Sequence, residues 1–296
     1  MTSQLVPPPE PTIDPSTPNI HQWPALGLTL FTEFITPAEE TTMITAFDSS
    51  SSQQTPHTNN KKRTRISQHF GYHFDYTTFG ASSSHFTPLP EYISSILPRL
   101  PIPIEHERIP DQFTVQYYPP GAGIPPHVDT HSMFGEALYS LSFGGDVPMV
   151  FRVAGRNEAR KMRLPKRSLA DAQDTVAGGG NACGGEKKGE ESEEEEHPAW
   201  ELMLPRRSLL VMTGPARYGY THGIKARKTD VVGGKAVLRQ GRYSITMRTV
   251  RRGDEIRCDC GYPGVCDARI REEMERAEGR KGDVFGDGNG DVTVGK

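Results

Sequence analysis

Residues 118–131 have the sequence YPPGAGIPPHVDTH, which joins the end of a strand-like segment to two potential metal ligands. His127 and Asp129 are two residues apart, so on an extended strand or at its exit both side chains project to the same face. The Pro125-Pro126 pair stiffens the approach to His127. The stretch therefore predicts a β-rich fold in which an imidazole and a carboxylate share one metal ion.

Short β-rich segments, separated by glycine and proline, continue on both sides of this stretch. They are residues 113–118, 137–143, 149–151, 201–204, 208–212 and 242–248. Two helical patterns precede them: residues 37–47, which begin with the capping box Thr36–Glu39, and residues 92–100, which end at Pro101. A series of short strands is typical of a sandwich or barrel. The sequence predicts an α+β fold with an all-β core and flanking N-terminal helices.

The chain of 296 residues is expected to form one folded domain over residues 25–267. The first twenty residues hold six prolines, so residues 1–24 are predicted to be a disordered leader. Glycine runs and an acidic run predict a disordered acidic insertion at about residues 153–198. The charged, glycine-rich residues 268–296 are predicted to be a disordered tail.

The composition limits the compartment and the partners. No stretch approaches the roughly 20 apolar residues of a membrane-spanning helix, so a cytoplasmic protein is expected, with a nuclear location left open. The net charge is only −3, so any nucleic-acid binding has to come from local basic patches.

His222 is the candidate third ligand for the metal. It follows the segment Ser208–Met212 and a Gly214-Pro215 turn. Two histidines and one carboxylate form a facial triad that leaves coordination positions open for an oxoacid and O2. The His-x-Asp pattern by itself also fits an ordinary hydrogen-bonded pair, and the triad would accept zinc or another divalent ion as well as iron.

The segment RYSITMR at residues 242–248 points to an anionic cofactor. Its alternation predicts an apolar outer face and a cavity face that carries Arg242, Ser244, Thr246 and Arg248. The planar guanidinium of Arg242 suits a bidentate salt bridge with the distal carboxylate of 2-oxoglutarate. Arg248 lies about 20 Å further along an extended strand, too far to bind the same carboxylate. Without the triad, surface arginines on an edge strand would explain the segment equally well.

Five segments in this order resemble the AlkB family of Fe(II)- and 2-oxoglutarate-dependent oxygenases. They are residues 118–131, 138–142, 204–209, 221–224 and 242–248, and the resemblance extends over residues 26–267. The branch that the chain resembles most is the eukaryotic transfer-RNA wobble-uridine hydroxylase. The resemblance implies a double-stranded β-helix, or jelly roll, with helices that support one side.

The resemblance also implies roles for individual residues. His127, Asp129 and His222 would bind iron. Tyr118 and Arg242 would contact 2-oxoglutarate, with Ser244 on the same cavity face, and Arg248 would lie near the reacting end. Gln116 stands where family members usually have asparagine, so one hydrogen bond to the oxoacid is expected to be weakened or relocated.

Three of the four cysteines form a second candidate metal site. Cys258, Cys260 and Cys266 supply three thiolates, one ligand short of a tetrahedral zinc site in a reducing compartment. His131 is the natural fourth ligand, and the resembled branch pairs a histidine at this position with three C-terminal cysteines around a structural zinc. Zinc would tie the C-terminal segment to the iron loop. The alternative is a redox-active or idle cysteine cluster.

The resemblance implies hydroxylation of a modified wobble uridine in tRNA. Basic residues near aromatic residues are predicted to contact nucleic acid, although each cluster also fits a solvated face. These residues are Lys61, Lys62, Arg63, Arg65, Arg206, Arg207, Arg217, Lys225, Arg227 and Lys228. The rival activities are oxidative demethylation of N-alkylated nucleobases in RNA or DNA and a non-catalytic, zinc-stabilised RNA-binding scaffold.

The expected partners follow from the same resemblance. Wobble-uridine hydroxylases of animals carry an RNA-recognition module and a methyltransferase domain on the same chain, and neither pattern occurs in these 296 residues. A separate tRNA methyltransferase and a monomeric oxygenase are therefore expected.

Overall fold

The computed structural model describes residues 5–54, 65–75, 80–105, 107–155 and 198–283. Nine strands form one large, largely antiparallel sheet in the order β1-β2-β3-β11-β8-β15-β6-β4-β5. These strands are β1 (Thr12–Ile13), β2 (Ile20–Trp23), β3 (Leu28–Phe31), β4 (Ile66–Asp75), β5 (Gly80–Thr87), β6 (Gln112–Tyr118), β8 (Leu138–Phe143), β11 (Ser208–Met212) and β15 (Arg242–Arg248).

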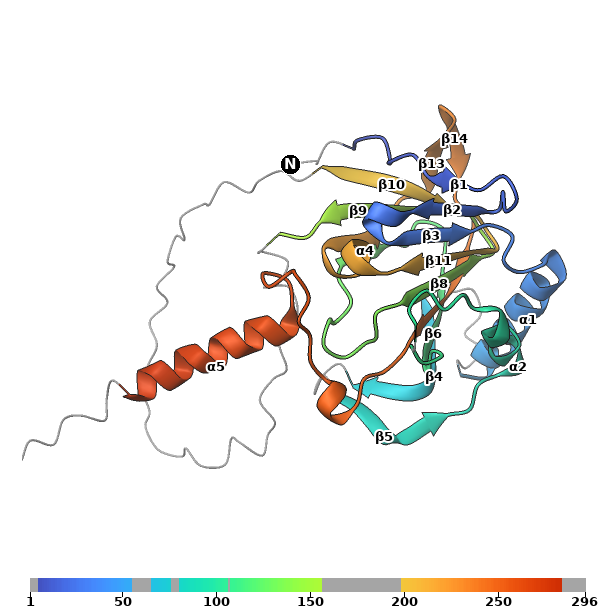
Figure 1. Ribbon diagram of the computed structural model, residues 1–296. Helices are drawn as coiled ribbons and strands as arrows, with labels where there is room; N and C mark the ends of the chain where they lie inside the picture. Colours follow the sequence, from blue (N-terminus) through green and yellow to red (C-terminus); the bar gives the residue numbers. More distant parts are fainter. Residues whose placement is uncertain (1–4, 55–64, 76–79, 106, 156–197, 284–296) are drawn as a thin grey trace, which may run out of the picture.

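A second sheet of four strands lies across from the large one (Figure 1). Its order is β10-β9-β12-β7, with bounds β10 (Ala199–Leu204), β9 (Val147–Val153), β12 (Tyr220–Ile224) and β7 (Ile124–His127). Apolar side chains from both sheets form one buried cluster, which includes Leu210 from β11 and Phe151 from β9. Two facing antiparallel sheets with a shared core confirm the predicted jelly roll.

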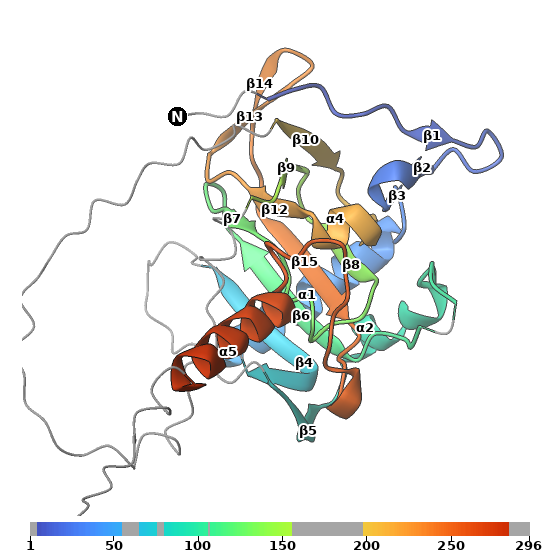
Figure 2. The ribbon, with the colours of Figure 1, turned by 60° about the vertical axis from the view of Figure 1, so that its left-hand side comes forward.

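A separate hairpin, β13 (Thr229–Val232) and β14 (Lys235–Leu238), projects from the top of the molecule in both ribbon views (Figure 2). Its exposed residues include Val231 and Leu238. The large sheet and the four-stranded sheet, rather than this hairpin, make up the core.

Helices cover the outer face of the large sheet. Met43 and Phe47 of α1 (Pro37–Gln54) and Ile93 of α2 (Glu91–Ser94) pack in one cluster with Ile245 of β15. Tyr243 and Met247 share that cluster, so the apolar face of β15 is buried. The predicted alternation of β15 is confirmed: its apolar face is the outer one, and the flanking helices bury that face in a second core.

Both predicted helices begin where the sequence indicated, but their lengths differ. The capping box of α1 is formed: the Thr36 amide donates to Glu39 Oε2 at 2.7 Å, and the Glu39 amide donates to Thr36 Oγ1 at 3.2 Å. The helix continues to Gln54, seven residues beyond its predicted end at residue 47. The second helix stops after one turn and is followed by the 3-10 turn Leu97–Arg99, because Pro98 cannot donate a helical hydrogen bond.

The two predicted disordered ends contain ordered elements. In the leader, β1 pairs with β2, β2 pairs with β3, and the Trp23 indole donates to the Pro9 carbonyl at 2.7 Å. In the tail, α5 (Asp267–Asp283) projects from the body on the side away from α1 (Figure 1). The predicted acidic insertion falls almost wholly within residues 156–197, which lie outside the described residues.

Short 3-10 turns complete the secondary structure at Pro24–Leu26 and Gly253–Glu255, and α4 (Gly214–Tyr218) leads into β12. None of the helices in the described part of the chain combines the length and apolarity that a membrane crossing requires.

Candidate active site

The three predicted iron ligands come together at the β12–β7 edge of the small sheet. His127 at the end of β7 is the register partner of His222 on β12, and Asp129 follows two residues later in the loop. One ligand atom from each residue lies within 4.8 Å of the other two. His222 Nε2 is 3.4 Å from Asp129 Oδ2, and the two imidazole rings are 4.5 Å apart between centroids.

Hydrogen bonding and charge prepare this cluster for a cation. His127 Nδ1 lies 2.9 Å from the Pro125 carbonyl, which can only accept, so Nδ1 carries the proton and Nε2 keeps its lone pair. Desolvation and the neighbouring His222 lower the pKa of His127 to about 4. Burial acts to raise the pKa of Asp129, but Arg248 and the two histidines hold it well below its ordinary value. A neutral imidazole beside a carboxylate is a donor set that suits a divalent metal.

Arg248 fixes the orientation of the Asp129 carboxylate. Its guanidinium donates to Asp129 Oδ1 from Nε at 2.9 Å and from Nη2 at 2.7 Å. Its Nη1 donates to the buried Gln112 at 3.1 Å. Oδ1 is therefore held by the arginine, while Oδ2 faces His222. The sequence placed Arg248 near the reacting end but gave no sign of Gln112, since a glutamine on a buried strand has no pattern that marks its partner.

Arg242 lines a pocket whose apolar residues include Ile124, Val147 and Ile224. Its Nη2 donates to Ser142 Oγ at 2.8 Å. Within the described part of the chain, the buried Nε and Nη1 of Arg242 have no hydrogen-bond partner. Burial lowers the pKa of this guanidinium to about 10, which leaves it cationic at neutral pH. An anionic acceptor would satisfy both the charge and the unpaired donors of this buried cation.

Gln116 and Ser244 occupy the same row of the sheet. Ser244 is buried and lies between Gln116 and Ser142 in register. The Tyr118 hydroxyl donates to Gln116 Oε1 at 2.5 Å, and Gln116 Nε2 donates to Ser67 Oγ at 3.0 Å. The longer side chain of glutamine thus engages Tyr118 and β4.

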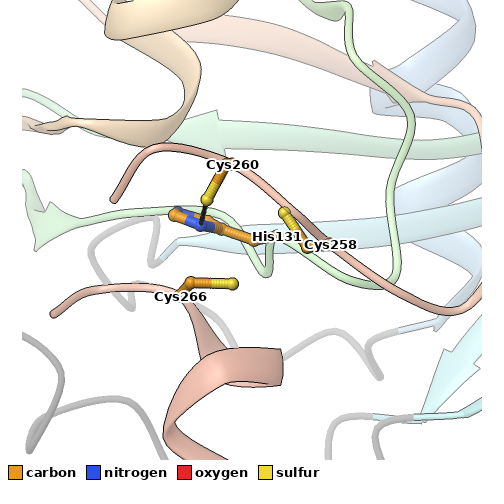
Figure 3. Close-up of side chains that lie close together, drawn as sticks. All are labelled: His131, Cys258, Cys260 and Cys266. Carbon is orange, nitrogen blue, oxygen red and sulfur yellow. Dashed lines mark hydrogen bonds between the residues drawn. The ribbon is translucent and has the colours of Figure 1, made fainter. Parts of the chain in front are cut away.

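The second metal cluster is also brought together (Figure 3). Ligand atoms of His131, Cys258, Cys260 and Cys266 lie within 4.8 Å of one another. His131 Nδ1 is 3.3 Å from Cys260 Sγ, and both His131 and Cys266 are fully buried. A hydrogen bond with Cys266 makes the largest contribution to lowering the pKa of Cys258 to about 3, and a hydrogen bond with His131 acts in the same direction. A lowered pKa favours the thiolate, the form in which cysteine binds metal.

Several of the predicted basic contacts to nucleic acid are engaged within the protein. Arg206 and Arg207 bind the buried Glu40, and Arg207 also binds Glu33. Three of the four basic residues near His222 are also engaged: Arg217 is buried, Arg227 binds Asp230 and Glu201, and Lys225 binds Glu201. Residues 61–63 lie outside the described residues. The basic patches are therefore smaller than the sequence indicated.

Two further residues with structural roles at the site were missed. Arg217 donates to backbone carbonyls in the iron loop, and the Asp267 carboxylate accepts from the His131 and Ser132 amides. In the sequence analysis, Arg217 was grouped with the basic residues predicted to contact nucleic acid, and Asp267 was only near the predicted end of the folded domain. Nothing in either local pattern distinguishes a buried charge from a solvated one.

Comparison with known proteins identifies the family. Residues 27–248 match the model of the 2OG-Fe(II) oxygenase superfamily. The chain is 31% identical over 263 residues to the tRNA (carboxymethyluridine(34)-5-O)-methyltransferase alkbh8 of Xenopus tropicalis. This alignment covers 82% of this chain and 34% of the frog relative. It is 34% identical over 250 residues to the alkylated DNA repair protein ALKBH8 homolog of Arabidopsis thaliana, and this alignment covers 82% of this chain and 63% of the plant relative.

The chain thus spans about a third of the frog relative and less than two thirds of the plant one. The solved structure of OsALKBH1 covers 77% of this chain with a TM-score of 0.44 at 16% identity. The match over residues 27–248 shows that the chain belongs to the 2OG-Fe(II) oxygenase superfamily, which implies Fe(II) and 2-oxoglutarate as its cofactors.

Proposed function

We propose that this protein hydroxylates a carbon of a modified wobble uridine in tRNA. In this proposal His127, Asp129 and His222 hold Fe(II), and Arg242 holds the distal carboxylate of 2-oxoglutarate. The observation that supports it best is that ligand atoms of the triad lie within 4.8 Å of one another. In addition, the buried Arg242 has an Nε and an Nη1 without a hydrogen-bond partner among the described residues. These are the two features that iron and an oxoacid require.

The residues around the triad have distinct tasks. Arg248 binds Asp129 Oδ1 and so presents the other oxygen toward the histidines. The Pro125 carbonyl orients His127 through Nδ1. With Fe(II), 2-oxoglutarate and O2 bound, such a centre supplies oxidation of a C–H bond to C–OH while 2-oxoglutarate becomes succinate and CO2.

The polar face of the large sheet favours a polar substrate. A series of side chains runs from the iron cluster across three strands: Arg248 donates to Gln112, Gln112 donates to Thr114 at 3.1 Å, and Thr114 lies 3.4 Å from His69. Gln112 and Thr114 are buried, whereas His69 is exposed. Hydrogen-bonding groups that begin at the metal and end at the surface suit a nucleobase that is turned out of its stack.

The names of the relatives suggest which nucleoside is the substrate. The name of the frog protein places its activity on carboxymethyluridine at position 34 of tRNA, and its similarity to this chain covers the oxygenase residues. We infer that this chain acts on the same kind of uridine, and that methylation is carried out by a separate methyltransferase. The name of the plant relative, a repair protein for alkylated DNA, favours demethylation as the second candidate.

A structural zinc belongs to the same proposal, with His131, Cys258, Cys260 and Cys266 as ligands. Two observations support it: a buried histidine among three thiols, and a lowered pKa at Cys258 that provides a thiolate. One histidine and three cysteines form a closed tetrahedral set, which is typical of structural rather than catalytic zinc.

The test is incubation of the full chain with Fe(II), 2-oxoglutarate and two RNAs. One RNA carries 5-methoxycarbonylmethyluridine at the wobble position and the other carries 1-methyladenine. We expect the uridine nucleoside to gain one oxygen in mass spectrometry and the adenine nucleoside to remain unchanged.

The His127→Ala variant is the control, and it should leave both nucleosides unchanged. Loss of the methyl group from 1-methyladenine would replace the hydroxylase with a demethylase at the same iron site. RNA binding without any turnover of the oxoacid would instead support a non-catalytic scaffold.

A further inference from the structure

Arg217 is buried between the two candidate metal centres. It belongs to α4 and is only 1% exposed. Its Nη1 donates to the Asp129 carbonyl at 2.9 Å, and its Nη2 donates to the Thr130 carbonyl at 2.7 Å. The guanidinium also lies 4.8 Å from the ring centroid of Tyr218. The two acceptors that the structure provides for this cation are thus main-chain oxygens of the loop that carries the iron ligand.

A buried arginine without a carboxylate partner is costly. Arg217 is almost fully buried, and transfer of a cation from water to the protein interior carries a large desolvation penalty. Among the described residues, no carboxylate lies within salt-bridge distance of its guanidinium, and its buried Nε has no hydrogen-bond partner. An apolar side chain of similar size at this position would be expected to stabilise the fold more than Arg217 does. The two bonds to the loop therefore need an explanation other than stability.

The loop whose carbonyls Arg217 binds contains ligands of both candidate metal centres. His127 and Asp129 belong to the iron cluster, and His131 belongs to the cysteine cluster. The carbonyls that Arg217 holds lie in the peptide units between Asp129 and His131. The far end of this loop is held separately, because Asp267 Oδ1 accepts from the His131 amide at 2.8 Å.

Arg217 also has a fixed position relative to the third iron ligand. It lies five residues before His222, and α4 leads directly into β12. One guanidinium therefore connects the segment that carries His222 to the segment that carries Asp129. Both attachments are short hydrogen bonds in an interior where water does not compete.

We propose that Arg217 is a positioning residue that sets the distance between the two segments of the iron triad and keeps the Asp129 loop in place independently of zinc. The inference rests on the proposed iron and zinc sites. Arg217 and zinc then restrain the same loop from two sides, so loss of both restraints has a larger effect than the sum of the separate losses.

The experiment measures Fe(II) affinity through the visible absorption of the Fe(II)–2-oxoglutarate complex, titrated without oxygen. Arg217→Met removes both bonds, and Arg217→Gln removes the buried charge while it keeps a short amide. We expect either variant to raise the Kd for Fe(II) by about 10- to 100-fold, the usual range for residues that orient metal ligands. Zinc content should remain that of the wild type.

The control is Arg207→Met, which removes a largely buried arginine from an ion pair with Glu33 and Glu40. Its Kd for Fe(II) should stay within about twofold of wild type, inside the range that a distant substitution produces. The coupling is tested by adding His131→Ala to Arg217→Gln. We expect the Kd of this double variant to exceed the product of the two single effects.

The outcomes separate the inference from the proposed function. A wild-type chain without the absorption band would refute the iron site itself. A normal wild-type band with an unchanged Kd in a folded Arg217 variant would overturn the positioning role alone. Multiplicative effects in the double variant would overturn the shared restraint, and loss of the fold in both Arg217 variants would show that the residue serves stability instead.

Discussion

At the scale of a single residue, Asp129 shows how much of the site is visible in the sequence. Its spacing from His127 predicted a shared metal, and the structure brings both ligands to His222. The groups that hold Asp129 in place could not be predicted. Arg248 contacts its side chain, and Arg217 contacts its carbonyl, from segments about 90 to 120 residues away. Such contacts depend on the packing of distant segments, which no local pattern records.

Arg242 provides the first prediction. Arg242→Met removes the buried cation from the pocket, and we expect the KM for 2-oxoglutarate to rise by about 100-fold, because hydrogen bonds to charged groups contribute about 1.5–3 kcal/mol each. The measurement is the rate of succinate formation as a function of 2-oxoglutarate concentration. Arg99→Met, which loses an exposed ion pair with Glu39, should leave this KM unchanged. Equal KM values in the Arg242 variant and wild type would exclude Arg242 as the carboxylate anchor.

At the scale of elements, the structure departs from the sequence where tertiary contacts decide. The capping box placed the start of α1 correctly, since a cap depends on residues three apart. Its end was missed because the serines after Asp48 bond to carbonyls of the preceding turn, for example Ser51 Oγ to the Phe47 carbonyl at 2.7 Å. The strand β2 was missed because its order depends on pairing with β1 and β3, and the proline content nearby favoured disorder.

Glu40 joins α1 to the strands and supports a second prediction. It is buried, accepts the Gly144 amide at 2.7 Å, and binds Arg206 and Arg207. Glu40→Gln should lower the free energy of unfolding by about 2 kcal/mol at neutral pH, since the charged hydrogen bonds are lost. Glu33→Gln, which loses a half-exposed partner of Arg207, should cost less than about 1 kcal/mol.

The pH dependence of this contact has a definite sign. Burial acts to raise the pKa of Glu40, but Arg206, the Gly144 amide and Arg207 together lower it below its ordinary value of 4.5. A lowered pKa means that the stabilisation is present above 4.5 and is lost as the pH falls through the folded-state pKa. Denaturant unfolding of wild type and Glu40→Gln should therefore differ at pH 7 and converge in acid. A difference that persists in acid would contradict the ionic role of Glu40.

At the scale of the whole molecule, the candidate zinc site joins the C-terminal segment to the jelly roll. Sequence reasoning predicted its four ligands, because closely spaced cysteines leave a recognisable pattern. It did not predict α5, which begins at Asp267 directly after Cys266. The helix is highly charged, so its first turn depends on the contacts of Asp267 with His131 and Ser132 more than on an apolar face.

Zinc therefore has a consequence for the molecule beyond its own ligands. We expect the wild-type chain to contain one zinc ion by elemental analysis, and Cys266→Ser to lose it. Hydrogen exchange should become faster in α5 of that variant, because the segment before the helix is released. Cys183→Ser, which changes the cysteine outside the described residues, should retain the zinc. A metal-free wild type with unaltered exchange in α5 would favour a redox-active or idle cluster.

The central claim is that iron, the oxoacid and a tRNA uridine meet at the His127, Asp129 and His222 site. The most direct test is turnover under ¹⁸O₂ with 2-oxoglutarate and tRNA that carries 5-methoxycarbonylmethyluridine, followed by mass spectrometry of succinate and of the nucleoside. We expect one labelled oxygen in each product from the wild type and in neither from Asp129→Ala. Unlabelled succinate, or labelled succinate beside an unmodified uridine at every tRNA concentration, would contradict the account.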